Sequence, residues 1–138
     1  MSVHRTLGVL CVMVCLGMAC SEAPISSSKV SLVGEWSWVE SCGGFAGDCR
    51  TPAKLGHSRS LVFMPGAVYV RYEDGQLKEK GSYKRTTSYD NILGKTMDAV
   101  ELSGLPWPML IGSLTNDSLV LIDDCIDCFS SRYARVSP

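Results

Sequence analysis

Residues 32–40 read LVGEWSWVE and contain the strongest strand signal in the chain. Trp36 and Trp38 fall on the same side as Leu32 under a period of two, and Glu35 falls on the other side. Successive side chains of a β-strand point to opposite faces of a sheet. The stretch therefore predicts a strand with one face in an apolar core and the other in water.

The same alternation recurs along the chain in short runs separated by turn residues. These runs are residues 59–64, 67–72, 77–87, 96–102, 109–114, 118–122 and 131–136. Asp74–Gly75 carries a hairpin signal between two of them. Helical spacing is absent, so we expect at most one or two helical turns, within residues 42–57. An all-β, up-and-down antiparallel barrel of about eight strands follows, because a meander of this length hides its edges by closing.

The N-terminus has the pattern of an export signal. Residues 7–19 form an apolar run, LGVLCVMVCLGMA, that follows His4 and Arg5. A spanning helix needs about 20 apolar residues, whereas a run of this length suits the hydrophobic part of a signal peptide. We therefore expect residues 1–19 to be a signal peptide.

Cys20 indicates the type of signal. A small residue followed by cysteine, here Ala19 and Cys20, resembles a bacterial lipobox, although Gly17 stands where leucine is usual. The resemblance implies an acylated Cys20 and anchoring to the membrane through lipid, with plain secretion after cleavage near Ala19 as the alternative. Ser21 is not the aspartate associated with retention in the inner membrane, so we expect the outer membrane. Residues 20–29 then form a flexible tether and residues 30–138 a single domain.

Charge and composition exclude one class of partner. The chain has 138 residues and a formal net charge of −1, with Lys and Arg scattered along it. Nucleic-acid binding needs a clustered basic face, so we expect no nucleic-acid partner. We expect the chain to be a monomer.

Removal of the signal leaves four cysteines besides Cys20: Cys42, Cys49, Cys125 and Cys128. In a closed barrel the first and last strands are neighbours, which places all four near one rim. Two disulfides are expected in an oxidising compartment. Three connectivities stay open, and the cross-rim pairs would close the longer loops.

Two functional interpretations of these cysteines, as a redox motif or as a zinc site, have less support than two structural disulfides. Cys125 and Cys128 have the Cys-x-x-Cys spacing of thiol–disulfide oxidoreductases, but the residues that follow predict a strand in place of the activating helix. A four-thiolate zinc site would need a closer pair than Cys42 and Cys49.

His57 is the single histidine left after cleavage, and no nucleophile–base pair is evident. We expect no enzymatic activity, no metal site and no cofactor.

The chain is similar to lipocalins in its opening and closing motifs. Gly34–Glu35–Trp36 resembles their Gly-x-Trp signature, and Arg135 resembles the arginine that packs on that tryptophan. A closer resemblance is to small lipocalin-like domains of Gram-negative lipoproteins of unassigned function. It covers roughly residues 33–135 and is carried by Trp36, Trp38, Val39, Ser41, Gly43, Gly44, Thr51, Pro52, Leu61, Val62, Phe63, Tyr69, Tyr72, Gly75, Gly81, Tyr83, Asp127, Phe129, Tyr133 and Arg135. A barrel-closing contact between Trp36 and Arg135 follows from it, and fold-level likeness carries no function.

The barrel interior is the remaining candidate site. The aromatic residues Trp38, Phe63, Tyr69 and Tyr83 fall on inward faces, and Trp107 falls over a barrel mouth. An eight-strand barrel either fills with side chains or holds one small ligand. We expect a lipid-anchored lipoprotein that binds a small apolar ligand. The alternative is a non-enzymatic envelope protein, acting as interaction partner, scaffold or inhibitor, with the filled core that short strands and bulky aromatics favour.

Overall fold

The structure is a computed structural model that describes residues 30–125 and 127–137. The expected signal peptide, Cys20 and the tether lie outside the described residues. Among the described residues, no helix is long and apolar enough to cross a bilayer.

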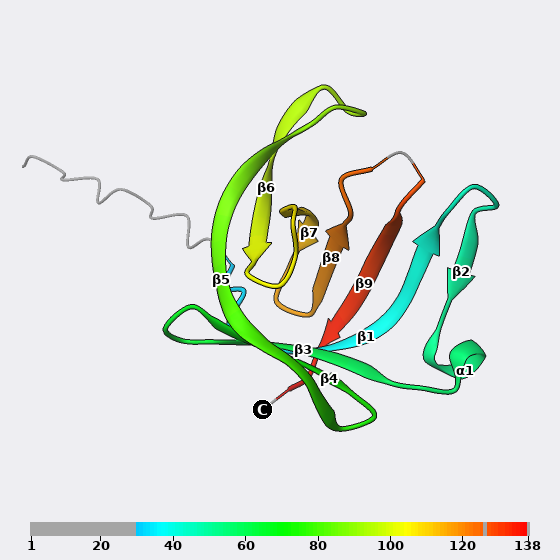
Figure 1. Cartoon of the computed structure of the whole chain (residues 1–138), viewed down its shortest axis with the longest axis vertical. Coiled ribbons are helices and arrows are strands. Elements are labelled where there is room, and N and C mark those ends of the chain that lie inside the picture. Colours follow the sequence, from blue (N-terminus) through cyan, green and yellow to red (C-terminus); the bar gives the residue numbers. More distant parts are fainter. Residues whose placement is uncertain (1–29, 126, 138) are drawn as a thin grey trace, which may run out of the picture.

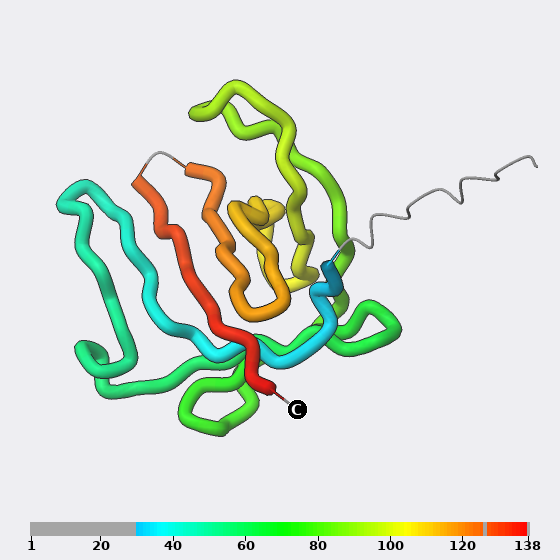
Figure 2. The backbone as a smooth tube through the Cα atoms, turned by 180° about the vertical axis from the view of Figure 1, so that it is seen from behind, coloured from blue at the N-terminus to red at the C-terminus, as the bar shows by residue number. Residues whose placement is uncertain are grey.

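Nine strands and one short helix follow each other along the described residues. They are β1 (Gly34–Gly43), β2 (Asp48–Arg50), α1 (Pro52–Leu55), β3 (Arg59–Met64), β4 (Val68–Glu73), β5 (Gln76–Asp90), β6 (Lys95–Leu102), β7 (Met109–Leu114), β8 (Ser118–Ile122) and β9 (Phe129–Arg135). All pairings are antiparallel, in the order β2-β1-β3-β4-β5-β6-β7-β8-β9. Strand β1 also pairs with β9, and Figures 1 and 2 show these two strands side by side. The predicted up-and-down barrel of eight strands is confirmed, with β2 as an addition outside it.

The segment between β1 and β3 holds two short elements. Strand β2 folds back on β1 as a hairpin, which the sequence did not indicate. Helix α1 is a single turn, begun by Pro52 and capped by Thr51, whose hydroxyl accepts a hydrogen bond from the Lys54 N–H. The expected helical turn therefore falls within residues 42–57.

The strands are strongly staggered around the barrel. The first half of β5 pairs with β4 and its second half with β6, so β5 curves around one side of the barrel (Figure 1). Residues 76–82 of β5 pair with β4 and residues 83–90 pair with β6, and such a shift along one strand requires steeply tilted strands.

Alternate connections define two ends of the barrel. Residues 65–67, 91–94 and 115–117 connect strands at one end, which residues 30–33 also cross, and we call it the closed end. Residues 44–58, 74–75, 103–108 and 123–128 connect strands at the other end, which we call the mouth. The largest fully buried side chains of the core are those of Trp36, Phe63, Tyr69, Val100, Leu110, Leu119 and Leu121.

Candidate ligand site at the barrel mouth

The structure brings Trp36 and Arg135 together at the closed end. The Cζ atom of Arg135 lies 4.1 Å from the centroid of the fully buried Trp36 ring. The guanidinium donates hydrogen bonds to the carbonyl oxygens of Ser31 (2.8 Å) and Val33 (2.9 Å), and to that of Asn116. The closed end is therefore sealed by a cation–π contact and by hydrogen bonds that fix the entering chain.

The glycine of the Gly-x-Trp motif has a steric reason. Gly34 has a φ of 142°, which disfavours a side chain, and a Cβ there would collide with Nη1 of Arg135. The indole N–H of Trp36 donates to the carbonyl oxygen of Leu32 at 2.9 Å. Gly34 therefore gives the arginine room to lie over the tryptophan.

Most of the residues expected to line a ligand belong to the core. The side chains of Phe63 and Tyr69 are almost fully buried, and the rings of Phe63 and Tyr83 meet edge to face at 4.8 Å. Trp38 is buried and donates its indole N–H to Ser41 Oγ at 2.8 Å. Trp107, in contrast, is 72% exposed. The structure therefore does not gather these five residues around one ligand.

A cavity of about 230 Å³ enters the barrel from the mouth, and we call it the mouth pocket. Its apolar lining consists of Leu61, Leu102, Leu105 and Met109, and its polar lining of Arg59, Ser60, Tyr69, Arg71, Glu79, Asp123 and Tyr133. Its volume is about that of eight liquid waters and lies below the range typical of drug-sized ligands. The lining combines apolar surface with charged groups of both signs.

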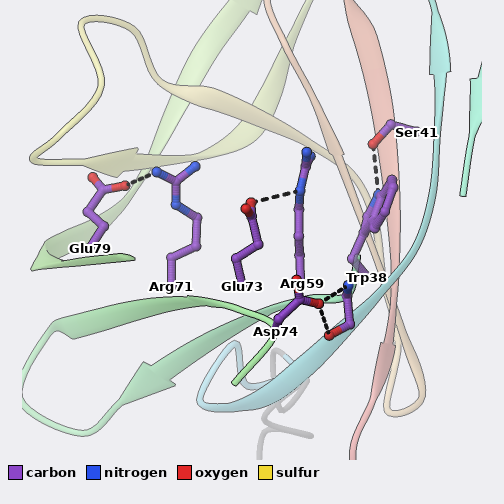
Figure 3. A network of polar contacts seen from close by, with 8 residues as sticks. Trp38, Ser41, Arg59, Arg71, Glu73, Asp74 and Glu79 are labelled. Carbon is purple, nitrogen blue, oxygen red and sulfur yellow. Dashed lines mark hydrogen bonds and ion pairs between the residues drawn. The ribbon is translucent and has the colours of Figure 1, made fainter. Parts of the chain in front are cut away.

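Two ion pairs stand in this part of the barrel (Figure 3). Arg71 Nη2 lies 2.8 Å from Glu79 Oε2, and the Tyr69 hydroxyl donates a short hydrogen bond to the same carboxylate. Arg59 Nε lies 3.5 Å from Glu73 Oε2. Glu79 is thus held from two sides, whereas Arg59 has one loose partner.

Arg59 is the least satisfied cation of the mouth pocket. Its Nε atom is buried and makes no hydrogen bond with the described residues. Its guanidinium lies over the Trp38 ring, 4.9 Å from the centroid, and the His57 ring stacks near the same indole at 6.3 Å. The Nε2 atom of His57 is likewise buried without a partner among the described residues. Buried polar groups of this kind are normally hydrogen-bonded, so these two nitrogen atoms have hydrogen-bonding capacity that the described residues leave unused, apart from the ion pair of Arg59 with Glu73.

Burial also shifts the pKa of three acids around the mouth pocket. Loss of solvation raises the pKa of Asp123, partly offset by a hydrogen bond from the Phe129 backbone. Burial raises the pKa of Tyr133; the nearby charge of Arg59 opposes this effect and that of Asp123 adds to it. Burial and then Glu79 raise the pKa of Tyr69. The environment of the pocket therefore disfavours added negative charge on the protein itself.

Two further hollows flank the exposed ring of Trp107. One, of about 490 Å³, is bounded by residues 105–109, Asp123, Asp124, Cys125 and Cys128, and shares Leu105, Met109 and Asp123 with the mouth pocket. The other, of about 510 Å³, lies between the same loop and the residues Ser82, Tyr83, Lys84, Glu101, Leu102 and Ser103. The loop that carries Trp107 therefore forms a wall common to all three hollows.

The cysteines form two local disulfides at the mouth. Cys42 and Cys49 face each other in the β1–β2 ladder and form a disulfide with a Cα–Cα distance of 4.1 Å. Cys125 forms a disulfide with Cys128, and their Cα atoms are 5.3 Å apart. Gly43 packs against the Cys128 backbone, so all four cysteines share one rim as expected. Of the three possible connectivities, the structure has the one in which each cysteine bonds to its neighbour in sequence. Strand β2 holds Cys49 directly opposite Cys42 and away from β9.

No family model, curated protein or solved structure matches the chain. The resemblance to lipocalin-like lipoproteins stays a prediction from the quoted sequence motifs.

Sequence reasoning missed the charged lining of the pocket. Strand β3 has Arg59 two residues before Leu61 and four before Phe63, so all three share one face of the strand; on β4, Arg71 shares a face with Tyr69 in the same way. This period-two spacing was the available signal, since an arginine on an inward face of a small barrel needs a partner or a ligand.

Proposed function

We propose that this chain is an exported lipoprotein, anchored through acylated Cys20, whose barrel mouth binds one small amphipathic molecule. The observation that carries the binding proposal is the mouth pocket, where the Arg59 guanidinium lies beside apolar side chains and has one loose ion pair, at 3.5 Å from Glu73, as its polar contact among the described residues. A barrel that only needed to be stable gains little from a loosely paired cation beside apolar surface.

The lining defines the chemistry of the ligand. An apolar part would lie on Leu61, Leu102 and Met109, and would extend under Trp107 into the adjoining hollow. A carboxylate, sulfonate or carbonyl oxygen would accept hydrogen bonds from Arg59. Because burial opposes additional charge on Asp123, an anionic head group would lie nearer Arg59 than Asp123.

A second candidate is an envelope interaction protein with a filled barrel. The packed core around Trp36, Phe63 and Tyr69 favours it, as does the exposure of Phe45 (98%) and Trp107 (72%) at the mouth. In that case the loops would contact a protein, and the mouth pocket would hold only water.

Binding of 8-anilinonaphthalene-1-sulfonate, an aromatic sulfonate, tests the first candidate. We expect its fluorescence to rise with saturable, one-site binding, and Met109→Trp to abolish this by filling the pocket. Met64→Trp is the matched control, since Met64 lies at the closed end and is partly exposed. Binding that survives Met109→Trp unchanged would favour the second candidate.

Arginine variants test the head-group contact. Arg59→Ala is expected to lower the affinity for the sulfonate by about tenfold, the effect expected from loss of a charge-assisted hydrogen bond. Arg132→Ala is the control, because Arg132 pairs with Glu40 on the outside of the rim (3.0 Å). Equal affinities for the two variants would contradict the assigned role of Arg59.

A further inference from the structure

The hairpin between β5 and β6 extends beyond the wall of the barrel. Strand β7 pairs with β6 only at Ala99 and Val100, and β4 pairs with β5 no further than Ser82. The outer part, residues 87–98, is thus a two-stranded ribbon without a third strand among the described residues, and it stands out from the barrel in Figure 1.

The end of this ribbon exposes three large apolar side chains. Tyr89, Ile92 and Leu93 are 56%, 64% and 56% exposed. The turn itself does not require them: the Asp90 carboxylate accepts hydrogen bonds from the backbone N–H groups of Ile92 and Leu93 at 2.8 and 3.0 Å. Asp90 therefore holds the two aliphatic residues in a fixed, outward-facing turn, where polar residues would ordinarily stand.

The exposed charge nearest this tip favours an anionic surface. Lys95 is exposed beside the turn, whereas Lys84, further down β5, stands opposite the exposed Glu101. The acidic groups of the ribbon are engaged elsewhere, since Asp90 is buried in the turn and Asp98 pairs with Arg85 at 3.0 Å. A tip of aliphatic residues flanked by tyrosine and lysine matches the depth profile of a membrane interface.

The entry of the chain links this ribbon to the tether. Arg85 on β5 donates a hydrogen bond to the carbonyl oxygen of Val30 at 3.1 Å. About seven residues of strand, or about 20 Å, separate Arg85 from Ile92. Ten tether residues can span up to about 35 Å, so a lipid on Cys20 can lie in a bilayer that the tip also touches.

We propose that Tyr89, Ile92 and Leu93 insert into the phospholipid bilayer in which Cys20 is anchored, so that the barrel stands on its β5–β6 hairpin. This inference rests on the lipid anchor of the proposed function. The inserted hairpin fixes the orientation of the barrel relative to the bilayer, which a lipid anchor at the end of a tether would not do by itself.

A pair of tryptophan probes tests the docking. The full chain, as Leu93→Trp or as the control Phe45→Trp, is reconstituted into vesicles of phosphatidylethanolamine and phosphatidylglycerol with brominated acyl chains. Both positions are exposed hairpin tips, and Phe45 belongs to the mouth. We expect brominated lipid to quench about half of the added emission for Leu93→Trp, and little for Phe45→Trp.

The outcomes separate the docking from the anchor. No quenching of Leu93→Trp, or equal quenching of both variants, would overturn the docking. Intact mass of the wild-type protein reports acylation of Cys20 independently, and a mass without acyl chains would refute the anchor. Quenching of Leu93→Trp by vesicles added to such unacylated protein would still support insertion of the tip.

Discussion

Two tryptophans of β1, Trp36 and Trp38, each lie against an arginine from a neighbouring strand, one toward the closed end and one toward the mouth. At the closed end Arg135 lies over Trp36 and donates three hydrogen bonds to backbone carbonyls. At the mouth Arg59 lies over Trp38, but its Nε makes no hydrogen bond with any residue that the structure describes and has only a loose ion pair with Glu73 at 3.5 Å. A cation over an indole is thus a structural contact where its donors are satisfied, and a candidate binding group where they are only loosely paired.

The closed end and the mouth also differ in the interactions that stabilise them. The closed end is held by burial and hydrogen bonding, whereas both disulfides and all three hollows lie at the mouth. Residues at the closed end should therefore contribute mainly to stability, and residues at the mouth mainly to binding.

The largest expected effect is at Trp36. Trp36→Ala should lower the free energy of unfolding by about 3–5 kcal/mol, because it leaves a cavity in the packed core. Trp107→Ala should change it by less than about 0.5 kcal/mol, since Trp107 is 72% exposed. Urea denaturation under oxidising conditions measures both, and similar losses would break the contrast between the ends.

The disulfides come next. In the chain-entropy model the loss of the Cys42–Cys49 bond costs about 2.5 kcal/mol and the loss of Cys125–Cys128 about 2 kcal/mol. The paired variants Cys42→Ser with Cys49→Ser, and Cys125→Ser with Cys128→Ser, should show these losses in denaturation curves. Peptide mapping without reductant checks the connectivity, and a peptide joining Cys42 to Cys125 or Cys128 would contradict the local pairs.

The two arginines offer the most direct comparison. Arg135→Ala should cost about 2 kcal/mol, because it removes a cation–π contact with the buried Trp36 ring and three hydrogen bonds to backbone carbonyl oxygens. Arg59→Ala should cost about 0.5 kcal/mol, since Arg59 contributes one loose, half-exposed ion pair. Thermal unfolding of the two variants side by side is the measurement. A larger loss for Arg59→Ala would assign it a structural role.

The smallest effect concerns pH. Burial raises the pKa of Asp123 above its unfolded value, so its favourable contribution is complete below the unfolded pKa and is lost as pH rises through the folded pKa. Asp123→Asn should therefore stabilise the protein at neutral pH, by less than about 1 kcal/mol for a half-buried group. Denaturation at pH 7 and pH 3 tests this. A gain that persists at pH 3 would have another cause.

The sequence by itself determined the strands and their order. Period-two alternation and turn residues identify every barrel strand, because each strand buries one face and the side-chain period is fixed by the backbone. The Gly-x-Trp motif and Arg135 likewise indicated where the barrel closes, since the first and last strands of a closed meander must be neighbours.

How full the barrel is, and which cysteines pair, depends on the tertiary arrangement of the strands. Alternation says that Phe63 and Arg59 share a face, but strand tilt and stagger determine that Phe63 is buried in the core and Arg59 stands at the mouth. The β2 hairpin, three residues without a strong pattern, sets Cys49 opposite Cys42. Both outcomes depend on distances between segments far apart in the chain, which local periodicity does not encode.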